Sequence, residues 1–330
     1  MKPFNYFPAT DLSSAVRELS SHASAMVIAG GTNLVDLMKE HVLTPMEVVD
    51  ITRLAMGEIR EMEDGGVSLG ALATNADTAR HPLVSERYPL LASAILAGAS
   101  PQLRNRATDG GNLLQRTRCP YFYDSALPCN KRLPGSGCPA REGYNRMHAI
   151  LGASEECVAT HPSDMCVALA ALGATVVLEG VDGARRVPFH DFHLLPGEHP
   201  ERETVMNPGE VITSIELPSS PFARHSHYLK IRDRRSYAFA LVSVAVGLEI
   251  EGGIIRSAGI ALGGVAHKPW RRQAAEDLLA GQKPSRETFS GVADALLAGA
   301  VPLPFNSFKI PLTRDAIVRA LAEAAGNPSL

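Results

Sequence analysis

Four cysteines are the residues of this sequence with the clearest capacity for chemistry. Cys119, Cys129, Cys138 and Cys157 lie within one segment of a 330-residue chain, and no cysteine precedes Cys119. Disulfide frameworks are typical of short secreted chains, so this clustering indicates a metal site or a redox centre. The intervals lack the C-x2-C pairs of zinc ribbons and bacterial ferredoxins. We expect four thiolates that hold a 4Fe-4S cluster. Structural zinc is the metal alternative, and free thiols or disulfides are a further one.

The segment that carries these cysteines also favours a ligand-bearing loop. It has three prolines before its third cysteine and almost no periodicity, and long structureless loops in compact domains are usually functional. Arg118, Lys131 and Arg132 could offset the negative charge of a thiolate-ligated cluster. The fifth cysteine, Cys166, lies in the apolar stretch DMCVAL, so we expect it to be a buried free thiol outside the cluster.

Two glycine loops form the second chemical feature. The first, AGGTNL at residues 29–34, lies between a strand and a helix, and the second, ATDGGNL, spans residues 107–113. Paired glycines let backbone N–H groups approach a phosphate, and Thr or Asn beside them can donate further hydrogen bonds. The shared composition predicts two halves of one pyrophosphate site, with two unrelated turns as the alternative. The sequence has neither the G-x-G-x-x-G pattern nor a Walker A loop, so another fold must hold the dinucleotide.

The elements that position these residues alternate between short strands and helices, and no interval recurs along the chain. An apolar segment leads into each expected strand, and polar caps such as Asp11 or Ser13 precede the expected helices. A unit ends near residues 219–224, where two prolines follow a strand. Strands are expected at 25–31, 48–51, 65–75 and 208–218, a helix–turn–strand unit at 161–180, three antiparallel strands within 227–272, and helices at 11–22, 76–81, 86–98, 272–280, 286–298 and 313–325.

Composition excludes several classes of protein. Hydrophobic residues make up 45% of the chain and the net charge is −3, which is typical of a soluble protein with a proper core and not of a nucleic-acid-binding surface. No apolar run approaches the roughly 20 residues that span a membrane. The N-terminus lacks the pattern of a secretory signal. Taken alone, the chain therefore indicates the cytoplasm, without excluding export together with a partner that carries a signal.

Five motifs resemble a known family. AGGTNL, T-x-G-G-N, H-P-S-D, K-x-R-x-R-x-S-Y and A-L-G-G-V occur in the order found in flavoprotein subunits of the xanthine dehydrogenase and carbon monoxide dehydrogenase family. In that family an S-D pair follows the second loop almost at once, whereas Ser163-Asp164 is displaced here by about 50 residues. The segment RCPYFYD…PCNKRLPGSGC fills the gap. It is similar to the cluster-bearing insertion in flavin subunits of bacterial periplasmic aldehyde oxidoreductases, and the 4-hydroxybenzoyl-CoA reductase flavin subunit also carries a cluster on an inserted loop.

This resemblance implies an α+β fold in two domains. Residues 1–220 would form a two-part FAD-binding domain of the vanillyl-alcohol-oxidase-like (PCMH) type, divided near 55–60, with the iron–sulfur insertion at about 116–158. Residues 221–330 would form a C-terminal domain with a three-stranded antiparallel sheet and helices.

The resemblance also implies a set of FAD contacts. Asp164 would accept hydrogen bonds from the FAD, Lys230 would lie near the flavin ring and stabilise its reduced anionic form, and Arg232 and Tyr237 would approach the isoalloxazine. The residues themselves leave open a helix cap for Asp164, a core position for Tyr237 and a packed or capping role for His161. They also leave open a solvated strand face for Lys230, Arg232, Arg234 and Arg235. The implied FAD-binding residues are Val27, Ile28, Ala29, Gly30, Gly31, Thr32, Asn33, Leu34, Thr108, Gly111, Asn112, Asp164, Lys230 and Arg232.

The implied function is electron transfer without substrate chemistry in this chain, since no nucleophile–base motif is present. A molybdenum cofactor-binding large subunit would oxidise an aldehyde, and a small 2Fe-2S subunit would complete a heterotrimer. The external acceptor could be oxygen, a quinone or a soluble carrier, because no NAD signature occurs. The resemblance implies the periplasm. The alternatives are a flavin subunit of another molybdenum hydroxylase (xanthine, CO or aromatic CoA-ester type), a stand-alone vanillyl-alcohol-type FAD oxidase, and a zinc-bound assembly subunit.

Overall fold

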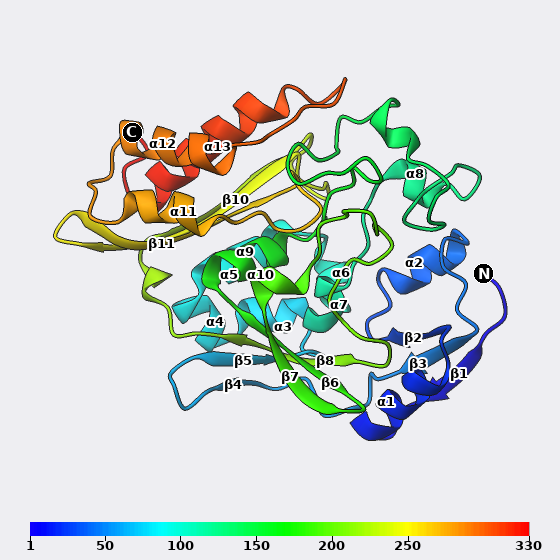
Figure 1. Cartoon of the computed structure of the whole chain (residues 1–330). Helices are drawn as coiled ribbons and strands as arrows, with labels where there is room; N and C mark the ends of the chain where they lie inside the picture. Colours follow the sequence, from blue (N-terminus) through cyan, green and yellow to red (C-terminus); the bar gives the residue numbers. More distant parts are fainter. Residues whose placement is uncertain (330) are drawn as a thin grey trace.

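Three parallel strands form the first sheet of the computed structural model, which describes residues 1–329 (Figure 1). The strands have the order β1-β3-β2, so β3 lies between β1 and β2 and pairs with both of them in parallel. Asp11 caps α1 by accepting a hydrogen bond from the Ser14 N–H, which selects Asp11 over Ser13. The elements are β1 (Asn5–Pro8), α1 (Leu12–Ser21), β2 (Ala25–Ile28), α2 (Leu34–Lys39) and β3 (Glu47–Asp50).

The second sheet is five-stranded and antiparallel, with the order β4-β5-β8-β6-β7. Its central strand β8 comes late in the sequence and inserts between β5 and β6. The cysteine segment lies in sequence between β5 and β6, which are two strands of this same sheet. The strands are β4 (Ile59–Glu61), β5 (Val67–Gly70), β6 (Thr175–Gly180), β7 (Gly183–Pro188) and β8 (Val211–Leu217). The helices are α3 (Asn75–Arg80), α4 (Pro82–Arg87), α5 (Pro89–Ala97), α6 (Pro101–Arg104), α7 (Asp109–Leu113), α9 (Asp164–Leu172) and α10 (Phe189–Phe192).

One helix prediction in this region was wrong. The helix expected over residues 86–98 is two helices, α4 and α5, which meet at Tyr88 and Pro89. Proline has no N–H to donate to the preceding turn and is favoured in the first turn of a helix. Pro89 therefore ends α4 and begins α5, and this break places Tyr88 in the core, 1% exposed.

The C-terminal part is a three-stranded antiparallel sheet with helices on one face. Strands β9 (Ser226–Ile231), β10 (Val242–Glu251) and β11 (Ile254–Gly263) lie in the order β11-β10-β9. Gly252 and Gly253 join β10 to β11 with φ angles of 58° and 77°, which a two-residue hairpin turn of this kind requires. The remaining helices are α11 (Gln273–Glu276), α12 (Arg286–Leu296) and α13 (Lys309–Ala324), and α13 begins earlier than the predicted 313–325.

The five-stranded sheet, the helices α5 and α9, the C-terminal sheet and the helices α12 and α13 form successive layers (Figure 1). One core lies between the five-stranded sheet and β10 and β11, with α5 and α9 filling it, and a second core joins the far face of the C-terminal sheet to α12 and α13. The cysteine segment, with α8 (Pro120–Tyr123) and a short 3-10 turn at Pro139–Arg141, lies beside these layers near α2. The predicted α+β class with a three-stranded antiparallel C-terminal sheet is confirmed.

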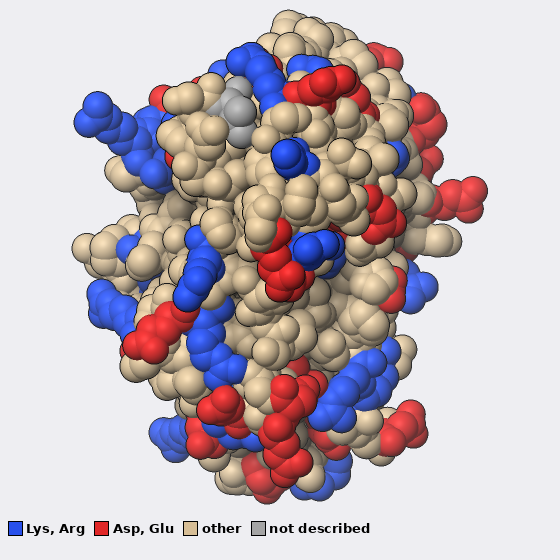
Figure 2. Space-filling model, turned by 90° about the vertical axis from the view of Figure 1, so that its left-hand side faces the viewer, with Lys and Arg blue, Asp and Glu red and all other residues tan. Residues whose placement is uncertain are grey.

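Charged side chains of both signs are interspersed on the face drawn in Figure 2, which accords with the small net charge. Within residues 1–329, no helix has both the length and the hydropathy needed to cross a membrane.

Candidate functional site

The two glycine loops are in direct backbone contact. The first follows the carboxyl end of β2, and the second contains Thr108, which caps α7, and all of α7 itself. A Cβ atom on Gly30 would lie 1.9 Å from the carbonyl oxygen of Arg106, a separation that no side chain tolerates. The Arg116 N–H also donates to Asn33 Oδ1 over 2.8 Å, which ties the first loop to the chain that follows the second. The loops are therefore adjacent halves of one structure, about 80 residues apart in the sequence.

A long cavity of about 1090 Å³ runs along these loops. This is slightly above the roughly 300–1,000 Å³ typical of small-molecule sites, which accords with a ligand as large as a dinucleotide. Its walls come from the first sheet, from the helices that pack on the five-stranded sheet, and from the C-terminal part of the chain. The C-terminal part contributes Tyr237, Ser243 and Gly264, among others. All of the FAD-binding residues implied by the resemblance line this cavity except Arg232, whose Nη1 donates to the Ala97 carbonyl.

The donors that face this cavity fit an anionic dinucleotide. The Nδ2 group of Asn33 is buried and has no hydrogen-bond partner, although Asn33 lines the cavity. A buried donor without a partner costs roughly 1–3 kcal/mol, so a ligand oxygen is a fitting acceptor for it. Gly31 has a φ of 71°, which lets the loop turn here and keeps its wall free of a side chain. The geometry can therefore hold a pyrophosphate at this end of the cavity.

A buried polar network fixes the second loop. Asn75 Nδ2 donates to Asp109 Oδ1 over 2.7 Å, and the Thr78 hydroxyl donates to Asp109 Oδ2 over 2.6 Å. Asn112 Nδ2 donates to Asn75 Oδ1, and the Ser163 hydroxyl donates to Asn112 Oδ1. The second loop and the Ser163-Asp164 pair are therefore joined side by side, although the cysteine segment separates them in sequence. Sequence reasoning missed Asp109, which is distinguished only by its position before the paired glycines.

Burial raises the pKa of Asp109 to about 7, and the hydrogen bonds from Thr78 and Asn75 oppose part of that rise. Because the folded pKa exceeds the unfolded value, the folded state binds the extra proton, and this stabilisation is lost as the pH rises from about 4 to 7. We expect Asp109→Asn to flatten this dependence, whose slope is at most about 1.4 kcal/mol per pH unit. Urea unfolding of both proteins in excess FAD at pH 4.5, 5.5 and 6.5 measures it. If the free energy of unfolding depended on pH in the same way in both proteins, Asp109 would not be the group that titrates between pH 4 and 7.

Asp164 and Lys230 form a buried ion pair at the cavity wall. Lys230 Nζ lies 2.8 Å from Asp164 Oδ2, with side chains 5% and 9% exposed. The Tyr228 hydroxyl donates to Asp164 Oδ1 over 2.6 Å. Ser163 is the N-cap of α9, since its Oγ accepts from the Cys166 N–H, so Asp164 is not the cap. Lys230 also donates to the Ala97 carbonyl, so its charge is offset by Asp164 in this structure.

Residues 233–237 form an exposed loop after β9, so Arg234 and Arg235 are solvated and Tyr237 is not part of a core. Tyr237 is 57% exposed and lines the cavity, so it is not a core residue. Its φ of 50° is unusual for an aromatic residue and is a form of backbone strain that often occurs at functional sites. The Arg234 guanidinium lies 5.8 Å from the Tyr237 ring centroid and donates to the Tyr237 carbonyl.

The four clustered cysteines are neighbours in the structure, and all are free thiols. Burial raises the pKa of Cys119 to about 12 and that of Cys157 to about 11, and other cysteines add to both rises: Cys157 and Cys129 act on Cys119, and Cys138 and Cys129 act on Cys157. Cys129 acts in the same way on Cys138. The segment thus brings together four thiols that resist ionisation unless a cation or a cluster compensates their charge.

Hydrogen-bond donors surround these sulfurs. The backbone N–H groups of Phe122 and Tyr121 lower the pKa of Cys119, and the Ala159 N–H donates to Cys157 Sγ over 3.5 Å. Asn130 holds the loop together, because its Nδ2 donates to the Glu156 carbonyl and its Oδ1 accepts from the Gly137 N–H. These donors fit sulfur ligands that carry negative charge.

One of the three predicted cations acts on a cysteine through its charge. Lys131 is buried and lowers the pKa of Cys157, and its Nζ forms an ion pair with Glu203. Arg118 lies 3.5 Å from Asp36, and Arg132 donates to backbone carbonyls such as that of Asp124. Glu203 was not predicted as part of this region. It forms a second ion pair with Arg116, so it binds two cations of the cysteine segment, Arg116 and Lys131.

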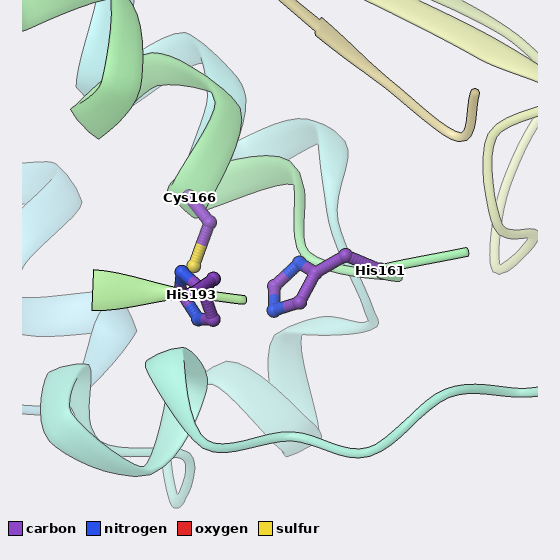
Figure 3. A group of neighbouring side chains, drawn as sticks. All are labelled: His161, Cys166 and His193. Atoms are coloured by element: carbon purple, nitrogen blue, oxygen red, sulfur yellow. The ribbon is translucent and has the colours of Figure 1, made fainter. Parts of the chain in front are cut away.

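His161, Cys166 and His193 form a separate group in which Cys166 and His193 are buried and His161 is partly buried (Figure 3). Their potential ligand atoms lie within 4.8 Å of one another. The His161 and His193 rings are tilted by 64° with centroids 4.5 Å apart, and His193 Nε2 lies 2.9 Å from the Leu113 carbonyl. Burial lowers the pKa of His193 to about 4, so its ring is neutral. Cys166 is buried and free, as expected, and His161 is a packed histidine. Sequence reasoning missed His193.

Comparisons with known proteins agree with this geometry. Residues 2–220 match the family model of the FAD-binding domain in molybdopterin dehydrogenase, and residues 227–324 match the CO dehydrogenase flavoprotein C-terminal domain. The aldehyde oxidoreductase FAD-binding subunit PaoB of Escherichia coli strain K12 is 47% identical over 98% of this chain and 99% of its own. The carbon monoxide dehydrogenase medium chain of Hydrogenophaga pseudoflava is 28% identical over 91% of this chain and 88% of its own.

Solved structures show the same architecture. A carbon monoxide dehydrogenase structure from Hydrogenophaga pseudoflava has a chain with a TM-score of 0.77 and 28% identity, covering 99% of each chain. Quinoline 2-oxidoreductase from Pseudomonas putida 86 has one with a TM-score of 0.75 and 26% identity, covering all of both. The resemblance inferred from the motifs is confirmed, and the chain belongs to the family of FAD-binding subunits of molybdenum hydroxylases.

Proposed function

We propose that this chain is the FAD- and 4Fe-4S-containing electron-transfer subunit of a molybdenum-dependent aldehyde oxidoreductase. When bound, FAD supplies two-electron storage and the cluster supplies one-electron transfer. The single observation that carries the proposal is the combination of the joined glycine loops with four neighbouring cysteines. The similarity to a subunit named for aldehyde oxidation, over nearly the whole of both chains, supports the substrate class.

The residues of this chain would bind and position the FAD and the cluster. Backbone groups of residues 29–34 and the unpartnered Asn33 amide would hold the pyrophosphate, with Thr108, Gly111 and Asn112 on the opposite side. The Asp164–Lys230 pair and Tyr237 would face the rest of the FAD. Cys119, Cys129, Cys138 and Cys157 would hold the cluster, with Lys131 offsetting its charge.

The spacing of the sulfurs favours a cluster over zinc. In residues 1–329, the groups whose ligand atoms lie within 4.8 Å of one another do not include three of these four cysteines. A zinc ion with four Zn–S bonds of about 2.3 Å would hold its sulfurs closer together than this. An iron–sulfur cube is wider, because the cluster itself lies between its ligands.

We further propose a heterotrimer with a molybdenum cofactor-binding large subunit and a 2Fe-2S small subunit, delivering electrons to an external acceptor. Medium chains and FAD-binding subunits among the relatives support a multi-subunit complex. A domain boundary at 220/221 accords with the two family matches. The periplasm, reached with a signal-bearing partner, is the proposed location, and it rests on the resemblance of the cysteine segment alone. Copurification from fractionated cells distinguishes it from the cytoplasm.

Metal analysis and an absorption spectrum of the purified full chain test the cofactor content. We expect flavin bands together with about four iron atoms per chain. Zinc without flavin would overturn the whole proposal. Flavin without iron would overturn the proposed cluster and leave the proposed FAD site standing.

A further inference from the structure

A histidine lies against one of the four clustered sulfurs. His148 Nε2 is 3.1 Å from Cys119 Sγ. The ring is 3% exposed and packs near Tyr121, with ring centroids 6.3 Å apart. Within residues 1–329 this is the one side-chain hydrogen bond to any of the four sulfurs, since the other donors to them are backbone N–H groups.

The C-terminal domain holds this histidine in place. Lys309 Nζ, at the start of α13, donates to the His148 carbonyl over 2.8 Å, and Asn306 Nδ2 donates to the same oxygen over 3.2 Å. Both Lys309 and Asn306 are fully buried, at 0% exposed. Two buried donors on one carbonyl fix the backbone of His148, and therefore the reach of its ring, much more firmly than a loop alone would.

The chemistry of the contact depends on the state of Cys119. A free thiol could give its own proton to the ring, but a sulfur that ligates iron is a thiolate and has none. Nε2 must then carry the hydrogen and donate it to the sulfur. Such a hydrogen bond withdraws charge from the sulfur and favours the more negative, reduced state of a cluster. Burial of the ring places the bond in surroundings of low dielectric constant, which strengthens it.

We propose that His148 is a positioning residue that raises the reduction potential of the cluster through an N–H···S hydrogen bond to Cys119, set by Lys309 and Asn306. This inference rests on the proposed function, because it requires the cluster at the four cysteines. It adds a specific element to that function: the C-terminal domain would set the electron affinity of a cluster held by the first domain.

A redox titration followed by electron paramagnetic resonance of the reduced cluster tests the proposal in the full chain. We compare wild type with His148→Leu, which removes the donor, and His148→Gln, whose amide N–H reaches about as far as Nε2. At the wild-type midpoint potential, the ratio of reduced to oxidised cluster should fall about tenfold in the leucine variant, the change that about 1.4 kcal/mol produces. The glutamine variant should restore most of that ratio at unchanged iron content.

A second measurement covers the case in which the leucine variant loses iron. Wild-type protein with ¹⁵N-labelled histidine should show a nitrogen coupling to the spin of the reduced cluster, and His148→Gln should lack it. Equal potentials in the three proteins, or wild-type spectra without a histidine coupling, would overturn the role of His148. Wild-type protein without iron would instead overturn the proposed cluster itself, so the two failures are distinguishable.

Discussion

Replacing Cys129 by Ser should remove most of the iron from this protein while leaving its FAD in place. A serine hydroxyl is a hard, weakly acidic ligand, whereas iron–sulfur clusters are held by thiolates, so three remaining cysteines cannot keep the cluster intact. We expect iron per chain to fall at least about fivefold, with loss of the broad cluster absorption and retention of the flavin bands. Because metal binding contributes to folding, the cysteine segment should also become more sensitive to proteases.

Cys166→Ser is the matched control for this experiment. Cys166 is buried in α9 within the separate group with His161 and His193, so its replacement can reduce stability but should leave the iron content unchanged. Iron retained in the Cys129 variant would refute the ligand assignment. Iron lost from the Cys166 variant instead would show that the cluster lies at the histidine group.

The glycine loops illustrate what the sequence could predict. Their residue types determine a local property, namely backbone that a phosphate can approach, and local properties are readable from a few adjacent residues. The contact between Gly30 and the carbonyl of Arg106 depends on the path of the chain through several intervening elements. Composition suggested that the two loops work together, but only the fold shows that they touch.

The ion pair at the cavity wall marks the limit of such prediction. Asp164 and Lys230 were both expected to face the FAD, and both line the cavity. Their partnership with each other, and with Tyr228, arises because α9 packs against β10 and β11 of the C-terminal sheet, whose third strand β9 carries Tyr228 and Lys230. A pattern of charges in β9 gives no information about which helix will cover it. A buried pair of this kind limits how much positive charge Lys230 presents to a bound cofactor.

The histidines were the least predictable residues. His193 lies in a loop after α10, and His148 lies between the third and fourth clustered cysteines, without any recognisable motif around either. Each owes its position to packing between distant segments: His193 against His161, and His148 against Cys119 and Lys309. By contrast, the four cysteines are recognisable by residue type and clustering, so the sequence could predict a candidate site there but not its surroundings.

Gly30→Ala should abolish most FAD binding, since the substitution acts where the two glycine loops touch. The new methyl carbon would lie 1.9 Å from the Arg106 carbonyl oxygen and 3.2 Å from the Cα of Ala107. Both atoms belong to the backbone, so relief requires the loops to separate. Such movement displaces the phosphate-facing N–H groups of the first loop from the second, and we expect FAD affinity to fall about hundredfold, or about 2.7 kcal/mol.

Gly291→Ala provides the matched control, because a Cβ at this position in α12 meets no atom within 4 Å. Alanine in a helix interior is favoured over glycine by roughly 0.5–1 kcal/mol, so this variant should bind FAD normally and unfold at the same or a higher temperature. Flavin fluorescence during titration of the FAD-depleted proteins measures both affinities. Wild-type affinity in Gly30→Ala would mean that the contact between the loops does not shape the FAD site. Equal losses in both variants would indicate general destabilisation. A loss confined to Gly30→Ala would instead link the touching loops to FAD binding.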